Sequence, residues 1–257
     1  MPGVRRLREG DWNILIRRIR RGECTPFLGA GACAGVLPLA GQIARDWTSE
    51  FGYPLSASTD LVSVAQFLSV EYRDSRFPKD LMKERCEAVL PNFNRQDEIH
   101  RVLAALPIPM YMTTNYDHFM KEALLHNPMD KKAPEQEICR WNEKISNYSS
   151  IFDREPDFTP SSARPVVFHF HGHTGILDSM VITEDDYLDF LINIGRDPTV
   201  LKRVEQAFTE TSLLFLGYRL ADWNFRVVFR SLFSYLKRNW VKAHISVQLP
   251  EEVSEER

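Results

Sequence analysis

Two glycines flank one alanine at Gly29, Ala30 and Gly31, after a short apolar run and before a helical pattern that begins near Leu39. Because neither glycine has a Cβ, backbone N–H groups there can approach phosphate oxygens closely, and the positive end of a following helix adds to the attraction. Loops that hold a nucleotide pyrophosphate have this arrangement. Tight turns without a ligand use the same residues, since glycine supplies a positive φ. Other parts of the chain must decide between the two interpretations.

Polar residues directly follow three further apolar runs. They are residues 115–117 (Asn-Tyr-Asp), 171–173 (His-Gly-His) and 217–224, which begin with Gly217 and Tyr218 and end with Asp222 and Asn224. An amide, a carboxylate and an imidazole can orient a substrate, stabilise positive charge and accept a proton. Each also has a structural explanation, because N-x-D caps helices and a histidine at a strand end is commonly a structural group.

The elements that must position these residues are strands alternating with helices. Apolar runs at residues 26–28, 108–114, 165–170, 179–182 and 212–218 predict strands, and 244–249 alternates like a last one. Helical spacing is present at 12–19, 40–51, 61–68, 81–90, 99–106, 119–124, 187–191, 198–209 and 225–239, with one more helix expected near 141–152. Fully apolar strands separated by helices indicate a parallel sheet covered on both faces, in which ligands bind beyond the carboxyl ends of the strands. The four polar strand ends should therefore converge.

Composition excludes several classes of protein. The chain has 257 residues, of which 44% are hydrophobic, so it can bury a sizeable core, and its formal net charge of -3 offers no field that would attract nucleic acid. The four cysteines, at positions 24, 33, 86 and 139, form no C-x-x-C pair, which argues against a disulfide framework and a zinc ribbon. No run approaches the ~20 apolar residues of a membrane helix, and the first residues lack the apolar segment of a signal peptide. We therefore expect reduced thiols, a cytoplasmic location and no membrane partner.

The sequence resembles the sirtuin-like family, in its prokaryotic branch found in antiviral defence systems. Four motifs carry the resemblance in the family's order: G-A-G-A-C at 29–33, T-T-N-Y-D at 113–117, F-H-F-H-G at 168–172 and L-F-L-G-Y-R-L-A-D-W-N at 214–224. The resemblance implies a Rossmann-like domain that binds NAD and cleaves the bond between nicotinamide and ribose. It implies that Gly29, Ala30 and Gly31 cradle the pyrophosphate, that Asn115 and Asp117 lie by the nicotinamide and its ribose, and that His171 is the catalytic histidine. Further NAD contacts are expected from Cys33, Thr114, Gly217, Tyr218, Asp222 and Asn224.

The expected fold is thus α/β, a Rossmann-like parallel sheet with helices on both faces and a smaller, mainly helical lobe. One domain should span residues 1–257, with the core at about 11–52, 107–125 and 165–250 and the lobe at about 53–106 and 126–164.

The chain departs from the family pattern in two places. Deacylating sirtuins carry two zinc-binding C-x-x-C pairs after the H-G motif, whereas here about ten residues separate His171 from the apolar run at Val181. Cys33 and Leu39 stand where the family has polar residues, which puts the ribose contacts of the first loop in question.

A metal is not expected. The H-x-H-x-H string at His169, His171 and His173 could place alternate residues on one face of a strand, but no carboxylate or cysteine lies at ligand spacing beside it. We expect His169 to be buried in the sheet, His171 to lie at the strand end and His173 to lie in the loop.

These features predict an NAD glycohydrolase that releases nicotinamide and ADP-ribose. Departure of neutral nicotinamide leaves an oxocarbenium-like ribose, which needs orientation, exclusion of competing water and a base. The resemblance further implies depletion of cellular NAD on phage infection, in a homo-oligomer or with a partner such as an ATPase or a sensor. Two alternatives stay open: an NAD-dependent protein deacylase, and an inactive module for nucleotide sensing or assembly.

Overall fold

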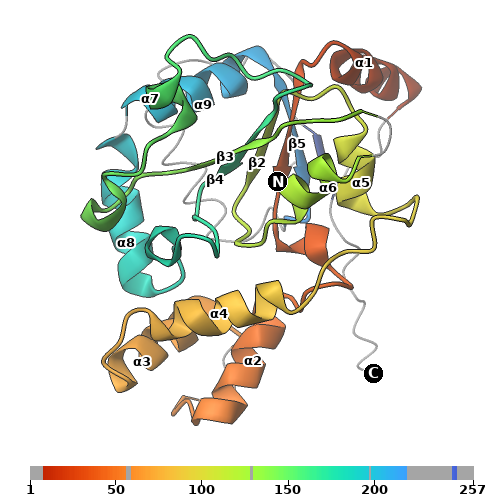
Figure 1. The fold of residues 1–257 in the computed structure, drawn as a ribbon. Helices are drawn as coiled ribbons and strands as arrows, with labels where there is room; N and C mark the ends of the chain where they lie inside the picture. The colour runs from red at the N-terminus through yellow and green to blue at the C-terminus, as the bar shows by residue number, and fades with distance from the viewer. Residues whose placement is uncertain (1–7, 56–58, 128–129, 197, 219–244, 248–257) are drawn as a thin grey trace, which may run out of the picture.

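Six parallel strands form one sheet in the computed structural model, which describes residues 8–55, 59–127, 130–196, 198–218 and 245–247 (Figure 1). The strands lie in the order β3-β4-β2-β1-β5-β6, and every pair is parallel. Their bounds are Cys24–Leu28 (β1), Met110–Thr113 (β2), Glu135–Ile138 (β3), Val166–His169 (β4), Ser212–Leu216 (β5) and Ile245–Val247 (β6). The strands β2, β3 and β4 lie on one side of β1, and the later strands β5 and β6 lie on the other, so the strand order reverses at β1. The predicted parallel α/β sheet is confirmed.

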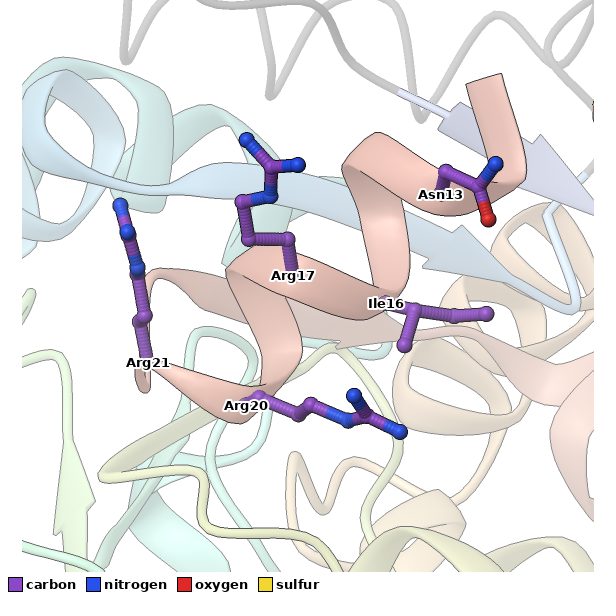
Figure 2. Close-up of a pocket in the computed structure, with 5 residues that line it drawn as sticks. All are labelled: Asn13, Ile16, Arg17, Arg20 and Arg21. Carbon is purple, nitrogen blue, oxygen red and sulfur yellow. The ribbon is translucent and has the colours of Figure 1, made fainter. Parts of the chain in front are cut away.

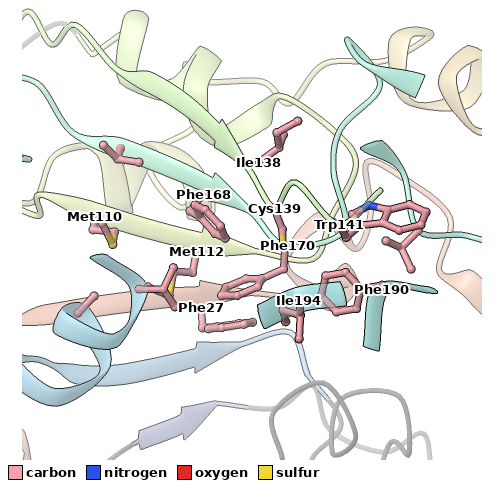
Figure 3. Close-up of a cluster of buried hydrophobic side chains, with 14 of the residues drawn as sticks. Phe27, Met110, Met112, Ile138, Cys139, Trp141, Phe168, Phe170, Phe190 and Ile194 are labelled. Carbon is pink, nitrogen blue, oxygen red and sulfur yellow. The ribbon is translucent and has the colours of Figure 1, made fainter. Parts of the chain in front are cut away.

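Helices cover both faces of this sheet, which explains why the strands are apolar throughout rather than alternating. One face is covered by α1 (Glu9–Arg20), α5 (Ile99–Ala104) and α6 (Phe119–Leu125), and the other by α7 (Ile151–Arg154), α8 (Glu184–Asn193) and α9 (Pro198–Glu210). Each face has its own hydrophobic core, the first under α1, α5 and α6 and the second under α7, α8 and α9. Successive residues of β1 point to opposite faces, so Leu28 packs in the first core and Phe27 in the second. Figure 3 shows the second core, where Phe27 stacks on Phe170 with ring centroids 5.4 Å apart.

A separate helical lobe lies beyond the carboxyl end of β1 (Figure 1). It consists of α2 (Ala40–Phe51), α3 (Leu61–Glu71) and α4 (Phe77–Glu87), which share a core built around Trp47, Val64 and Leu68. Short 3-10 segments connect other elements: η1 (Ala30–Cys33), η2 (Glu143–Ile145), η3 (Leu177–Ser179) and η4 (Ile194–Arg196). None of the described helices combines the length and the apolar character that a membrane crossing requires.

The boundaries of the lobe differ from those expected. The sequence assigned residues 40–51 to the core and 99–106 to the lobe, but α2 packs with α3 and α4, whereas α5 packs with α6 against the sheet. The described part of residues 126–164 likewise belongs to the sheet layers, because β3 pairs with β4, and Trp141 and Phe152 join the core on the α7, α8 and α9 face. Helical spacing reveals which side of a helix is buried but not what covers it.

Side chains cap two of the described helices. Asp60 caps α3 by accepting a hydrogen bond from Val62 N, and Thr183 forms a capping box with Asp186 at the start of α8. Two expectations were wrong: residues 179–182 form no strand, and 141–152 contain only η2 and α7. A short buried run can equally be extended backbone beside a sheet, as here, where Val181 N donates to His171 O. The expected helix at 225–239 lies outside the described residues.

Two glycines allow the loops after β1 and β5 to pack in direct contact. Gly31 N donates to Gly217 O at 3.0 Å, and Gly217 has a φ of +76°. A Cβ on Gly217 would lie 2.2 Å from Ala32 N, and one on Gly31 would lie 2.8 Å from Gly217 Cα. Both positions therefore require glycine, and at Gly217 the requirement is steric as well as conformational.

Gly217→Ala should destabilise the protein far more than Gly52→Ala. Both glycines have positive φ, +76° and +67°, but a Cβ on Gly52 would meet nothing within 4 Å. Gly52→Ala should cost about 1 kcal/mol from conformation alone. Gly217→Ala should cost at least about 3 kcal/mol because backbone must also move. Denaturant unfolding of both variants measures the difference, and equal costs would show that the two loops do not pack as described.

Candidate functional site

The carboxyl ends of four neighbouring strands lie at one level of the sheet. Leu28 is paired with Thr113 on one side and with Leu216 on the other, and Thr113 is paired with His169. The next residues stay in contact, since Thr114 N donates to Leu28 O and Gly29 N donates to Leu216 O. The segments that follow β1, β2, β4 and β5 therefore converge at one edge, as the sequence predicted.

The glycine turn after β1 is held by backbone hydrogen bonds. The N–H groups of Gly29 and Gly31 donate to Leu216 O at 2.9 Å and to Gly217 O at 3.0 Å, whereas Ala30 is exposed and its N–H has no partner among the described residues. In this structure the two glycines thus serve close packing of loops, and η1 begins between them at Ala30, with Gly29 as its N-cap. Pyrophosphate binding by these amides stays a prediction.

Tyr218 connects the turn to the β2 end. Its hydroxyl donates to Leu28 O at 2.8 Å and lies 2.8 Å from Thr114 Oγ1, and its ring covers Gly29, where a Cβ would lie 2.9 Å from ring atoms. Thr114, Gly217 and Tyr218, three of the predicted NAD contacts, are therefore brought together. Asp222 and Asn224 lie outside the described residues.

Asn115, Asp117 and Cys33 form a polar cluster in which Asp117 and Cys33 are buried and Asn115 is half-buried. Asn115 Nδ2 donates to Gly29 O at 3.1 Å and to Cys33 Sγ at 3.2 Å, and the Cys33 thiol donates to Asp117 Oδ2 at 3.2 Å. Asp117 Oδ1 accepts from Phe119 N, the first residue of α6, so this carboxylate also satisfies one backbone N–H at the start of that helix. Burial and the Asp117 carboxylate raise the pKa of the Cys33 thiol well above its usual value. The thiol stays protonated and is no reactive nucleophile in this state.

His171 lies apart from the other two histidines of its string. Its ring packs edge-on against Tyr187 and Phe190 of α8, with centroids 5.2 and 5.3 Å away. Its buried Nε2 has no hydrogen-bond partner among the residues that the structure describes. Burial lowers the pKa of His171 to about 3, so the imidazole is neutral at pH 7. Because buried polar atoms are normally paired, an unpaired ring nitrogen at this edge of the sheet suits a substrate group.

His169 and His173 instead gather with His118, which follows Asp117. The ring centroid of His173 lies 4.9 Å from that of His118 and 5.0 Å from that of His169. His169 Nδ1 is 3.1 Å from Asn115 O, so this group supports the loop after β2. The expected positions of the three histidines are confirmed: His169 lies in β4, His171 lies at the end of the strand and His173 lies in the loop that follows.

Sequence reasoning missed two groups close to the site. His100 of α5 lies beside Cys33 and Asp117, and its Nδ1 is 2.7 Å from Glu98 Oε1. The region was interpreted as an apolar helical stripe, and the only available signal was a histidine two residues after a glutamate. Tyr116 is the second group that sequence reasoning missed. Its hydroxyl donates to Val181 O at 2.6 Å and so holds the segment beside His171 in place.

Polar contacts hold the helical lobe against α8. Lys79 Nζ lies 2.9 Å from Asp186 Oδ1 in a largely buried ion pair, while Ser63 Oγ donates to Glu184 and Gln66 Nε2 donates to Asp185, each at 2.8 Å. The lobe therefore contacts the first turn of the helix that packs on His171.

A pocket on α1 lies elsewhere. Figure 2 shows it lined by side chains of α1, among them Arg17 and Arg20, and by Arg21, which directly follows this helix. Since α1 leads into the amino end of β1, this pocket is not part of the site at the carboxyl ends.

Comparison with known proteins gives consistent relatives. A family model described as a SIR2-like domain matches residues 109–257, more than half of the chain. The chain is 28% identical over 242 residues to a protein of Enterococcus faecium named NAD(+) hydrolase ThsA, covering 89% of this chain and 45% of that protein. Proteins of the same name from Acinetobacter baumannii (strain 532279) and Bacillus cereus (strain MSX-D12) are each 25% identical, covering 88% and 83% of this chain and 42% and 40% of theirs. The chain thus spans less than half the length of these relatives.

Acid should destabilise the fold through His171. Its pKa is about 3 when folded and ~6.5 when unfolded, so below pH 6.5 the unfolded state binds the extra proton and stability falls as pH falls. His171→Gln should lose about 1–2 kcal/mol less stability than the unchanged protein between pH 7 and pH 5. Denaturant unfolding at both pH values tests this, with Phe190→Leu as a control that weakens packing without removing a titrating group. Identical pH dependence in His171→Gln and the unchanged protein would contradict burial of a neutral imidazole.

Proposed function

Because the chain belongs to the SIR2-like domain family, we propose that it hydrolyses NAD to nicotinamide and ADP-ribose at the carboxyl edge of its sheet. The observation that carries the proposal is the unpaired Nε2 of neutral His171 at the same edge as Asn115 and Asp117. Relatives named NAD(+) hydrolase ThsA support it, with the limit that they are more than twice as long as this chain.

His171 would act as the base. Loss of nicotinamide leaves an oxocarbenium-like ribose, and the attacking water or a ribose hydroxyl must give up a proton. Burial alone keeps the pKa of His171 at about 3, which makes the imidazole a weak base in the empty site. NAD brings two negative phosphates, and nearby negative charge raises the pKa of a histidine. Substrate binding would thus increase the basicity of the residue when it is needed.

Asn115 and Asp117 would position the substrate. With Nδ2 of Asn115 bonded to Gly29 O and Cys33 Sγ, the amide oxygen is left to orient a ribose hydroxyl or the water. Asp117 accepts one bond on each oxygen, and a carboxylate has about four acceptor sites, so it retains capacity for the carboxamide or for developing positive charge. Gly29, Ala30, Gly31, Cys33, Thr114, Gly217, Tyr218, Asp222 and Asn224 remain the proposed NAD-binding residues.

The proposed setting is antiviral defence. The motif resemblance supports a role as the effector that depletes NAD on phage infection, in the cytoplasm, as a homo-oligomer or with an ATPase or sensor partner. On this proposal NAD is a substrate rather than a resident cofactor, and the chain itself binds no nucleic acid and no membrane.

His171→Gln should lower the rate of NAD hydrolysis at least ~100-fold, the contribution typical of a general base. Asn115→Ala should also lower it strongly. Nicotinamide release by the purified protein, alone and with its natural partners, is the measurement, and circular dichroism checks folding. His126→Gln, which changes an exposed histidine at the end of α6, serves as control. Undiminished hydrolysis by folded His171→Gln would overturn the assignment.

Nicotinamide release should not depend on an acylated peptide. NAD hydrolysis uses water as the acceptor, whereas a deacylase needs acetyl-lysine to complete turnover. Release should therefore proceed without peptide and should not increase when acetyl-lysine peptide is added. A strict requirement for the peptide would favour the deacylase, and no release under either condition, with or without partners, would favour an inactive nucleotide-sensing module.

A further inference from the structure

Three buried metal-ligating side chains meet beneath the glycine turn. Cys33 Sγ, a ring nitrogen of His100 and a carboxylate oxygen of Asp117 all lie within 4.8 Å of one another, and each residue is at most 6% exposed. Cys33 Sγ and Asp117 Oδ2 are 3.2 Å apart, a separation compatible with two ligands on one tetrahedral ion. They come from η1, from α5 and from the loop between β2 and α6.

Neighbouring groups orient two of these side chains. Glu98 Oε1 lies 2.7 Å from His100 Nδ1, so when Nδ1 donates to this carboxylate, Nε2 carries the free lone pair. Metal-binding histidines typically make such a hydrogen bond to a carboxylate. Phe119 N donates to Asp117 Oδ1, and the Phe119 ring packs edge-on against His100 at 5.8 Å. The donors are therefore fixed in place before any ion arrives.

We propose that Cys33, His100 and Asp117 bind one thiophilic divalent cation of the zinc class. Sulfur, imidazole and carboxylate together are a donor set that zinc accepts. A thiolate and a carboxylate supply two negative charges, which balance the ion in a buried site where unpaired charge is costly. The fourth position of a tetrahedral ion falls to water.

Binding exchanges a proton for the metal. The S–H bond of Cys33 breaks and a sulfur–metal bond forms, Asp117 exchanges its thiol hydrogen bond for a metal–oxygen bond, and one proton leaves to solvent. No electron is transferred. Because protons and the metal compete for the Cys33 sulfur, affinity should fall as pH falls. Residues 33, 100 and 117 are far apart in the sequence, so no local motif spacing predicts the site. The site also differs from the two C-x-x-C pairs of deacylating sirtuins and from the H-x-H-x-H string of this chain.

Cobalt(II) tests the site by spectroscopy, without reference to NAD. Adding Co²⁺ to the purified, chelator-treated protein should give one equivalent of binding, a near-ultraviolet thiolate-to-cobalt band and the visible bands of a tetrahedral ion. Cys33→Ser should abolish the thiolate band, and His100→Gln or Asp117→Asn should weaken Co²⁺ binding at least about tenfold. Cys139→Ser and His126→Gln, a buried cysteine and an exposed histidine outside the cluster, are the matched controls and should change neither.

A second measurement needs no variant and covers the case in which Cys33→Ser fails to fold. In weak buffer near neutral pH, the unchanged protein should release one proton for each Co²⁺ bound, and Zn²⁺ should displace the cobalt. Absence of the thiolate band from the unchanged protein, or its persistence in folded Cys33→Ser, would overturn the proposal. Binding without proton release would overturn it as well.

Discussion

The common level at which four parallel strands end is the constraint on which the site depends. Leu28 is paired with residues of both β2 and β5, and β2 is paired in turn with β4, so the chain leaves the sheet at one edge in four places. Residues almost 190 positions apart are thereby neighbours, as Gly29 and Gly217 show. The contact between these loops requires glycine at both Gly31 and Gly217, because a side chain on either would meet backbone.

Burial decides the protonation of the groups at this edge. His171 is neutral because aromatic rings of α8 surround it, and Cys33 is protonated because it is enclosed beside a carboxylate. Burial thus makes His171 a weak base and makes Cys33 an unreactive thiol. On the two proposals above, each would change its protonation state when charge enters the site, as phosphate near the imidazole or as a cation at the thiol.

Much of this architecture could be predicted from the sequence, because strand ends, glycine turns and helix caps are local patterns. The polar residues after each apolar run illustrate this, since the ends of β1, β2, β4 and β5 meet at one edge of the sheet as expected. Predictions failed where the partner of a buried face lies far along the chain. The apolar side of α2 looks the same whether it packs on the sheet or on α3, and β3 is too short and polar to be recognised without β4 beside it. His100 was missed for the same reason, since its neighbours Cys33 and Asp117 are brought to it only by folding.

The Asp186 carboxylate makes the helical lobe and the candidate base parts of one mechanical unit. One of its oxygens pairs with Lys79 of the lobe, and the other accepts from Ile182 N and Thr183 N, which start α8. One residue later on the same helix, Tyr187 packs against His171. Asp186 and Tyr187 thus connect the lobe to the His171 imidazole through consecutive residues of one helix, with no loop between the two contacts.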